Sequence, residues 1–377
     1  MKIVVVGAGI IGTSVAYRLA EAGAEVVIVD ENRVGGGTSC VTYAWVNACE
    51  KLSSRAYFDL NMAGRAAHGR IVDDLGGGEW YPRPGIVQWQ DAEAEAGGVD
   101  TTSSEEKFRR LRDWGYPAEM LPAEELRRLE PDVDADAYGS RPVILYPQDG
   151  WCYATQYAGR VAGAACNRHN ARLVIGKVAR IDIAGGRTTG VTLADGIRIE
   201  ADAVVNCAGR WANSIIEAET SRIPLKPTSG LVAYTAPAGI QLERGLRTPT
   251  VNLRPDGGGR LLLRAGDIDK LVDGNRPVDE FREQAEELMR RARVLLPALR
   301  DVPIEAVRIA IRPEPADSYS AIGRLPDVEG LYVAITHSGV TLAPFIGEGL
   351  TREILHSQEV PEFAAFRPAR FFREKAI

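Results

Sequence analysis

The chain has 377 residues, 45% of them hydrophobic and 25% charged, with a formal net charge of −6. This is the composition of an ordinary globular protein, and the length favours two domains over one compact core. The acidic balance argues against nucleic acid as a partner, and no apolar run is long enough for a transmembrane segment. The five cysteines and four histidines have no metal-ligand or redox spacing, so we expect a cytoplasmic protein without a metal site.

The chain begins with the pattern of a dinucleotide-binding unit. The β-branched run at residues 2–6 predicts a buried parallel strand, and a G-x-G-x-x-G sequence follows it directly. In such a loop, Gly7 permits the tight turn, Gly9 lets a pyrophosphate approach the backbone, and Gly12 lets the next helix pack closely on the strand. We therefore expect a nucleotide cofactor at this turn.

A predicted helix and a second strand complete the unit. Residues 13–23 have helical spacing with Gly23 as the C-terminal cap, and residues 24–29 form a second apolar run that ends at Asp30. A carboxylate at this place accepts hydrogen bonds from the hydroxyl pair of a ribose and repels a 2′-phosphate. The unit therefore favours a cofactor without a 2′-phosphate.

The rest of the chain alternates between mixed α/β segments and β-rich segments, and no internal repeat is visible. Residues 91–106 are interpreted as an exposed connection, and the stretch from 223 to 311 as mostly strand. We expect further strands at 85–89, 172–175, 177–181, 190–193, 196–199, 203–209 and 330–335, and helices at 105–114, 123–129, 153–168, 278–295 and 341–355.

This order indicates an α/β fold in which a Rossmann-like nucleotide domain is assembled from discontinuous segments. An α+β substrate domain, built on an antiparallel sheet, is inserted between them. We place the nucleotide domain at residues 1–80, 140–220 and 312–377, and the substrate domain at residues 81–139 and 221–311.

Four blocks of the sequence resemble one known family. They are the fingerprint 7–12 with Asp30, GTS at 37–39, AVVNCAGRW at 203–211, and a C-terminal block made of IRP at 311–313, SAIG at 320–323 and HSGVTLAP at 337–344. With these blocks in this order, nearly the whole chain resembles the D-amino-acid oxidase-like family of FAD-dependent oxidoreductases, which includes glycine oxidase, sarcosine oxidase and D-amino-acid dehydrogenases.

The resemblance implies a Rossmann-like FAD-binding domain and a reaction at an amine. The family oxidises an amino acid or related amine carboxylate by hydride transfer from the α-carbon to flavin N5, which gives an imine that hydrolyses to a keto acid. No cysteine falls in the C-terminal flavin region and no histidine follows Ser39, so we expect non-covalent FAD.

Residue chemistry and the resemblance together indicate which residues hold FAD. Thr38 and Ser39 offer hydroxyls and backbone N–H groups, and Gly209 lets the chain turn close to the cofactor, whereas the contact of Val178 with adenine rests on the resemblance alone. The helix after Gly339 presents unpaired N–H groups that stabilise negative charge on reduced flavin. The predicted cofactor-binding set is Gly7, Gly9, Ile11, Gly12, Asp30, Glu31, Thr38, Ser39, Val178, Gly209, Trp211, Gly339, Val340, Thr341 and Leu342.

Arg312 is the predicted substrate clamp, because its guanidinium matches a carboxylate with two parallel hydrogen bonds. A structural salt bridge is the alternative for Arg312, and Arg308, on the same strand face, competes for the clamp role. Arg264 falls near the place where sarcosine oxidases have a lysine that assists oxygen, but we interpret it as a surface arginine on an edge strand. The predicted catalytic residues are Arg312 and His337, and the predicted substrate pocket consists of Tyr319, Trp45, Asn47 and Arg308.

Three other functions stay open at this point. A 2-hydroxy-acid dehydrogenase would use His337 as the base for the hydroxyl proton. A non-catalytic flavin-binding subunit of a multi-subunit dehydrogenase would bind FAD without reducing it, and an NAD-dependent dehydrogenase would have no use for the C-terminal block. The expected partners are a small amine or amino acid and an acceptor, oxygen or quinone; the chain is a monomer or a homodimer.

Overall fold

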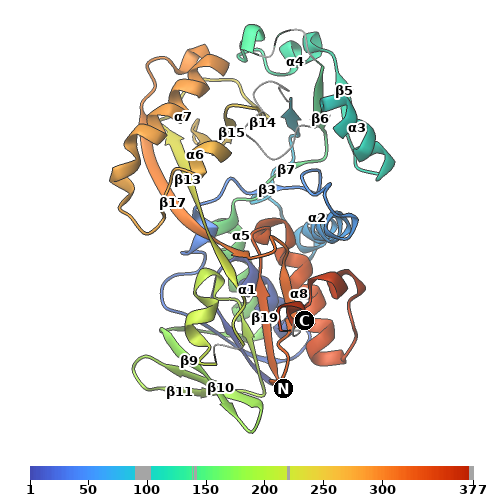
Figure 1. The fold of residues 1–377 in the computed structure, drawn as a ribbon, viewed down its shortest axis with the longest axis vertical. Helices are drawn as coiled ribbons and strands as arrows, with labels where there is room; N and C mark the ends of the chain where they lie inside the picture. The colour runs from blue at the N-terminus through green and yellow to red at the C-terminus, as the bar shows by residue number, and fades with distance from the viewer. Residues whose placement is uncertain (90–102, 138, 140–141, 219–220, 373–377) are drawn as a thin grey trace, which may run out of the picture.

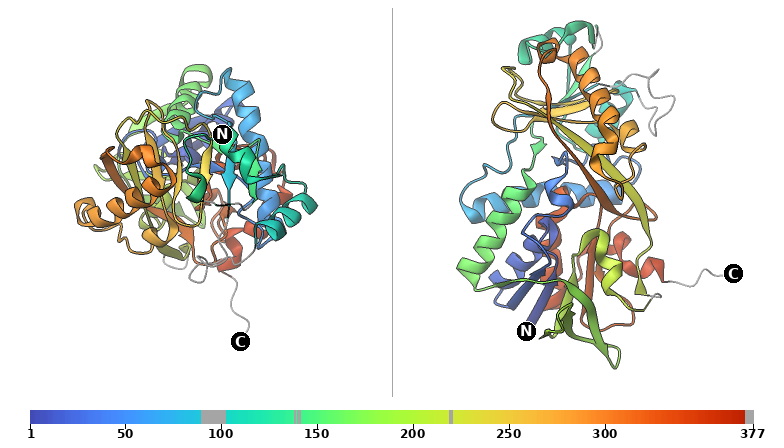
Figure 2. Two further views of the ribbon diagram at one scale, coloured as in Figure 1. Left: turned by 90° about the horizontal axis from the view of Figure 1, so that it is seen from above. Right: turned by 90° about the vertical axis from the view of Figure 1, so that its left-hand side faces the viewer.

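The computed structural model describes residues 1–89, 103–137, 139, 142–218 and 221–372. They form two layers stacked along the long axis of the molecule, each built on its own large sheet (Figure 1, Figure 2). The first layer holds the first and the last of the described residues, and the second consists of residues from the middle of the chain. The result is an α/β fold with one mostly parallel sheet and one mostly antiparallel sheet, as the sequence predicts.

The first sheet has six strands in the order β18-β19-β12-β1-β2-β8. Four consecutive parallel pairings join β19, β12, β1, β2 and β8, and β18 adds an antiparallel edge. The central strand β1 is buried on both faces, with side chains at most 4% exposed after Lys2, which explains its unbroken apolar run. The bounds are β1 Lys2–Val6, β2 Glu25–Asp30, β8 Arg172–Ile175, β12 Ala203–Asn206, β18 Ala321–Arg324 and β19 Leu331–Ile335.

Three helices pack together on this sheet, with α1 between α5 and α8. The bounds are α1 Ile10–Glu21, α5 Ala154–His169 and α8 Gly339–His356, each within three residues of its predicted range. A small three-stranded sheet lies beside them, formed by β9 Val178–Ala184, β10 Arg187–Leu193 and β11 Arg198–Glu200. Its β10–β11 pairing is the predicted hairpin.

The second sheet has eight strands in the order β17-β13-β16-β15-β14-β4-β6-β5, and all pairings are antiparallel except β14–β4. Helix α7 covers one face, where a leucine-rich core lies, and the other face looks toward the first layer. The bounds are β4 Ile86–Gln88, β5 Glu119–Leu121, β6 Val143–Tyr146, β13 Leu225–Thr235, β14 Gly245–Arg247, β15 Asn252–Pro255, β16 Leu261–Arg264, β17 Ile304–Pro315, α6 Gly266–Asp269 and α7 Arg282–Leu295. Strand β6 pairs here although its residues fall within the range 140–220 that we assign to the nucleotide domain.

Helix α2, Arg55–Leu75, was not predicted. Ser54 caps its beginning by accepting the Tyr57 N–H at 3.3 Å, and Gly76 ends it in the left-handed region at φ 69°. Gly64 lets α2 approach α8, since a Cβ there would lie 2.5 Å from the Thr341 carbonyl oxygen. The remaining elements are α3 Ser104–Asp113, α4 Ala123–Leu129 and a short ribbon of β3 Trp45–Val46 with β7 Gly150–Trp151.

Two further outcomes concern the predicted elements. Most of the predicted connection over 91–106 lies outside the described residues, and its last three residues belong to α3 instead. The predicted helix over 278–295 divides into a 3-10 turn, Val278–Phe281, and α7. Across the described ranges, no helix is both long and apolar enough to cross a membrane.

Candidate active site

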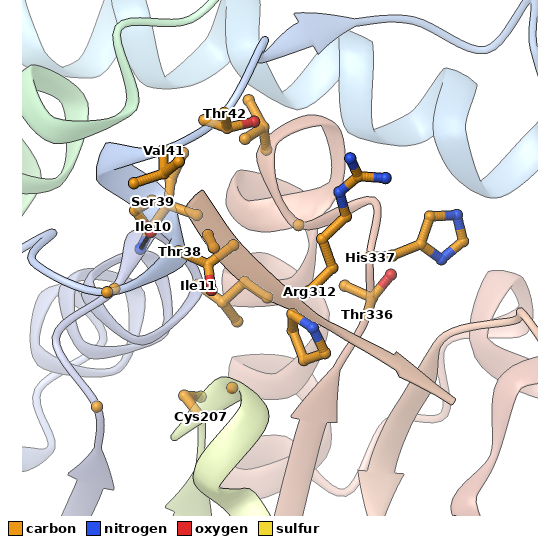
Figure 3. A pocket seen from close by; sticks show the side chains of 18 of the residues that line it. Ile10, Ile11, Thr38, Ser39, Val41, Thr42, Cys207, Arg312, Thr336 and His337 are labelled. Carbon is orange, nitrogen blue, oxygen red and sulfur yellow. Dashed lines mark hydrogen bonds between the residues drawn. The ribbon is translucent and has the colours of Figure 1, made fainter. Parts of the chain in front are cut away.

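A cavity of about 690 Å³ lies between the two layers. Its walls come from segments far apart in the chain: the turn after β1, the end of β2, the segment 36–51, the turn before β9, the end of β12, the inner face of the second sheet, and the beginning of α8. Figure 3 shows Ile10, Thr38 and Ser39 on one side and Arg312 and His337 on the other. The cavity therefore joins the predicted dinucleotide site to the predicted substrate site.

The glycine fingerprint is held to the end of β2 by Asp30. One Asp30 carboxylate oxygen accepts the Ala8 N–H at 2.7 Å and the other accepts the Asn32 N–H at 2.9 Å. Gly7 has φ 102°, which only glycine adopts easily, as the predicted tight turn requires. Gly12 does not line the cavity; a Cβ there would overlap the Gly7 carbonyl oxygen, so Gly12 serves the close packing of α1 on β1.

The beginning of α1 offers N–H groups to the cavity. The Ile10 N–H donates to Ser39 Oγ at 3.1 Å, and the first bond within the helix runs from the Thr13 N–H to the Gly9 carbonyl at 3.0 Å. The N–H groups of Ile11 and Gly12 therefore have no acceptor within the helix, which suits a phosphate. A Cβ on Gly9 would come no closer to another residue than 3.4 Å, so the space in front of Gly9 is open to a ligand.

The other predicted residues of the dinucleotide end also line the cavity. They are Glu31, Thr38, Val178, Gly209 and Trp211. The Thr38 hydroxyl donates to the Ile311 carbonyl at 2.9 Å and so ties this wall to β17. Cys207 lines the same end and was not predicted as a site residue.

The beginning of α8 forms the cavity wall across from the second sheet. Gly339, Val340 and Thr341 line it, as predicted. The prediction is wrong for Leu342, because its N–H donates to the Ser338 carbonyl at 3.1 Å and its side chain is fully buried. The helix reaches its first internal hydrogen bond one residue earlier than the sequence suggested.

Arg312 and Arg264 meet at one carboxylate. Arg264 donates to Asp269 Oδ2 from Nε at 2.9 Å and from Nη2 at 2.6 Å, and Arg312 Nη2 donates to the same oxygen. Arg312 therefore has a structural ion pair with Asp269. Because both arginines also line the cavity, Arg312 still faces the predicted substrate space.

The interpretation of Arg264 as a surface residue on an edge strand is wrong. Strand β16 lies inside the second sheet between β13 and β15, with α7 on one face and the cavity on the other. Burial, together with the positive charge of Arg312, lowers the pKa of Arg264 to about 10. Sequence alone does not show which short strand is an edge, because strand order depends on pairing across the chain.

Tyr319 and Arg308 do not line this cavity. The ring of Tyr319 packs edge-on against Tyr57 at a centroid distance of 5.3 Å. The Arg308 guanidinium lies 5.3 Å from the centre of the Tyr234 ring, in a neighbouring hollow of about 480 Å³. Arg308 shares a strand face with Arg312 but lies four residues away along the strand, where it lines the neighbouring hollow instead.

Trp45 and Asn47 line the cavity as predicted. The Trp45 Nε1–H donates to Asp149 Oδ2 at 2.9 Å, and the fully buried Asp149 also accepts from Arg65 at 2.9 Å and Tyr116 at 2.8 Å. Burial raises the pKa of Asp149 to about 6 despite these donors. Asp149 thus positions Trp45, a role that the sequence did not predict.

His337 lines the cavity as a neutral imidazole. Burial, with the charge of Lys51 nearby, lowers the pKa of His337 to about 4. Its Nδ1 is buried and has no hydrogen-bond partner in the part of the chain that the structure describes. A ring nitrogen that is both buried and unpartnered is free to meet a ligand.

Sequence reasoning missed several polar residues of the cavity wall, among them Glu50, Lys51, Arg247 and Asn252. Glu50 and Lys51 come shortly after Asn47, which was predicted for the substrate pocket. Arg247 and Asn252 belong to short strands whose alternate residues are leucines, a pattern that indicates one polar face. The described residues contain no cluster of three His, Cys, Asp or Glu side chains suited to a metal ion.

Comparisons with known proteins agree with this geometry. Glycine oxidase from Bacillus licheniformis is 28% identical over 379 residues, covering 97% of this chain and 96% of that protein. The crystal structure of glycine oxidase from Geobacillus kaustophilus superposes with a TM-score of 0.83 at 23% identity, covering 98% of each chain. That of L-proline dehydrogenase from P. horikoshii gives 0.82 at 21%, covering 99% of this chain and 98% of the other, so both structures show the fold.

The profile of the FAD dependent oxidoreductase family, DAO, matches residues 2–353. The match covers the fingerprint, both sheets and the beginning of α8, which together form the cavity. The chain therefore belongs to the DAO family of FAD-dependent oxidoreductases.

Proposed function

We propose that the protein oxidises an amino acid or related amine carboxylate to an imine, which hydrolyses to a keto acid. The observation that carries the proposal is the position of Arg312, whose guanidinium faces the cavity that begins at the glycine fingerprint. The names of two proteins similar to this chain, glycine oxidase and L-proline dehydrogenase, support an amino acid as the substrate class. When bound, FAD supplies the acceptor for the hydride that leaves the substrate α-carbon.

The residues of the chain hold and orient the reactants. Asp30, the first turn of α1 and Ser39 would hold the dinucleotide part, and the N–H groups at the beginning of α8 would stabilise negative charge on the reduced cofactor. Arg312 contacts Asp269 through Nη2, and the other N–H groups of the guanidinium can still donate to a substrate carboxylate. This fixes the substrate in one orientation and excludes water from its anionic end.

We propose that FAD is bound without a covalent bond. Of the cysteines in the described residues, Cys207 lines the cavity. It lies at the fingerprint end, because a Cβ built on Gly12 would lie 3.3 Å from the Cβ of Cys207. Burial raises the pKa of the Cys207 thiol, so it does not form the thiolate that a flavin link requires. Acid precipitation of the holoprotein should leave the yellow colour in the supernatant, whereas a yellow pellet would show a covalent bond.

The alternative, oxidation of a 2-hydroxy acid, requires a base for the hydroxyl proton. His337 is the candidate, since its Nδ1 is buried in the cavity wall without a partner. A general base works best when its pKa is near the working pH, and that of His337 is about 4. The low basicity favours an amine substrate, whose neutral form needs no base for hydride transfer.

Anaerobic reduction of the bound flavin tests these alternatives together. The yellow holoprotein is mixed with D-, L- and N-methyl amino acids, simple amines and 2-hydroxy acids while the visible flavin band is followed. Bleaching by amino acids supports the proposal, and bleaching by hydroxy acids alone overturns it in favour of the alternative. A protein that no compound bleaches would instead be a non-catalytic flavin-binding subunit. Reoxidation of the bleached protein by air or only by a quinone identifies the acceptor.

A further inference from the structure

A row of polar side chains crosses the cavity face of the second sheet. Arg247 on β14 is paired with Asn252 on β15, and Asn252 is paired with Arg264 on β16. Directly paired residues project from the same face of a sheet, and all three line the cavity. Their strand neighbours project from the opposite face into the core under α7: Leu246, Leu253 and Leu263.

Arg312 extends the positive charge of this row. Its guanidinium shares Asp269 Oδ2 with that of Arg264, so the two guanidinium groups meet across one oxygen. Asp269 is 8% exposed, and its other oxygen accepts the Leu231 N–H at 2.9 Å. One carboxylate thus compensates two arginines.

Glu50 is the second carboxylate near the row, and its charge is already engaged. The Lys107 ammonium, 1% exposed, forms an ion pair with Glu50, and Gln88 donates to it at 3.2 Å. Although burial opposes its ionisation, Lys107 and Arg247 hold the pKa of Glu50 below its usual range. Arg247 Nη2 lies 3.6 Å from Glu50 Oε2, beyond hydrogen-bond distance, so Arg247 is the outer partner of this pair.

The end of the cavity next to the second sheet therefore carries more positive than negative charge. The cations are Arg247, Arg264, Arg312 and Lys107, with Lys51 also on the cavity wall, and the carboxylates are Asp269 and Glu50. The other acids of the described cavity wall, Asp30 and Glu31, lie at the dinucleotide end. A bound substrate would cover at least two positive charges in excess, which is expensive without an anion, and one substrate carboxylate compensates only one of them.

We propose that the substrate is an amino dicarboxylic acid, with one carboxylate on Arg312 and the second acidic group on Arg247. This inference rests on the proposed function and names the substrate class of the same site. Arg264 lies between the two in the row and shares Asp269 with Arg312.

The first test compares acidic amino acids with their amides. Aspartate and asparagine, and glutamate and glutamine, have nearly equal size, and both enantiomers of each are used for anaerobic flavin reduction. We expect at least one acid to give a kcat/KM at least about 10-fold above that of its amide. If the amides reduce the flavin as well as the acids, the inference fails while the proposed function stands. If no amino acid of any kind reduces it, the proposed function itself fails.

The second test measures binding without turnover. The oxidised holoprotein is titrated with succinate and glutarate, and with butyrate and valerate, while shifts of the flavin band are followed. We expect dissociation constants at least about 10-fold lower for the dicarboxylates. Equal affinities for both classes would overturn the inference.

A matched pair of variants assigns the second acidic group. Arg247→Gln should abolish the preference for dicarboxylates, because it removes the charge that binds the second acidic group, while Glu50 keeps Lys107 as its partner. Arg290→Gln makes the same chemical change on the exposed side of α7, where Arg290 pairs with Glu287 at 2.6 Å, and should preserve the preference. A preference that survives in Arg247→Gln would remove Arg247 from the site.

Discussion

The guanidinium of Arg312 lies across the backbone of Gly230, in the space that a side chain at residue 230 would occupy. A Cβ on Gly230 would overlap Arg312 Nη2 and lie 3.0 Å from both Nε and Cζ. Arg312 on β17 is paired with Thr228 on β13, so Gly230, two residues further along β13, is its diagonal neighbour across the two strands. The glycine therefore opens the route by which Arg312 contacts Asp269 and the cavity.

Gly230→Ala should displace the guanidinium without unfolding the sheet, because the far end of an arginine side chain moves easily. We expect unchanged FAD content and an apparent KM for the best amino acid substrate at least about 10-fold higher. Gly239→Ala is the control, since a Cβ at Gly239 would meet no other residue within 4 Å. Wild-type kinetics in Gly230→Ala would show that the position of Arg312 does not matter.

Arg312→Ala should leave the yellow colour intact and lower kcat/KM by about 100-fold or more. Folding should persist because Asp269 keeps Arg264 as its partner at 2.6 Å. Steady-state kinetics and the flavin absorbance of the purified variant provide the two readouts. Unchanged kinetics would leave Arg312 with its salt bridge alone.

Gly9→Val should give a folded but colourless protein. The added side chain would enter the open space in front of Gly9, where we place the pyrophosphate, and its nearest neighbour there is Ser39 Oγ at 3.4 Å from the Cβ. The backbone of Gly9, at φ −70°, accepts any residue, so the fold should be retained. Circular dichroism checks the fold and absorbance near the flavin band checks the cofactor; a yellow variant would contradict the assignment.

The buried His68 predicts a pH dependence of stability. Its Nε2 lies 2.8 Å from the Val340 carbonyl oxygen, and burial lowers its pKa from 6.5 to about 4. Between these values the unfolded chain binds a proton that the folded protein does not, so the contribution of His68 to stability is lost as the pH falls from 6.5 to 4. The full loss is about 3 kcal/mol.

Asp149 has the opposite effect on stability over nearly the same pH range. Because its pKa is raised in the folded protein, the folded state binds the proton more tightly than the unfolded chain, and the contribution of Asp149 to stability rises as the pH falls. The wild-type curve therefore mixes two effects, and a variant is needed to separate them. The Tm difference between wild type and His68→Gln should shrink steadily from pH 6.5 to pH 4. A constant difference would show that His68 does not titrate in this range.

Asp149→Asn should destabilise the fold by about 3–5 kcal/mol, because it leaves the nearly buried Arg65 without a charge partner. The expected readout is a large drop in Tm at pH 8, where the Asp149 carboxyl is ionised. Asp317→Asn is the control: it breaks the half-exposed pair with Arg370 and should cost about 1 kcal/mol or less. Equal effects of the two substitutions would mean that the buried network adds nothing beyond a surface pair.

Some of the site could be predicted because it depends on neighbours in the chain. The fingerprint, Asp30 and the beginning of α8 are short motifs in which a strand or loop leads directly into a helix, and the structure places nearly all of them on the cavity. The prediction that Leu342 belongs to the cofactor site failed, because a helix boundary can shift by one residue without a change in the sequence pattern. Helix α2 was not predicted, although Ser54 and Gly76 are typical residues for the beginning and the end of a helix. Polar residues interrupt its long apolar stripe and obscure the helical pattern.

Local periodicity or the chemistry of one residue was enough to predict the dinucleotide-binding unit, the α/β class and Arg312 as the clamp candidate. Which polar residues share the cavity with Arg312 depends on how distant segments pack. Arg247, Asn252 and Arg264 meet because three short strands pair in one register, and Asp269 joins Arg264 to Arg312 from a separate helix. Strand register and helix placement depend on the packing energy of the whole sheet, which no local sequence pattern contains.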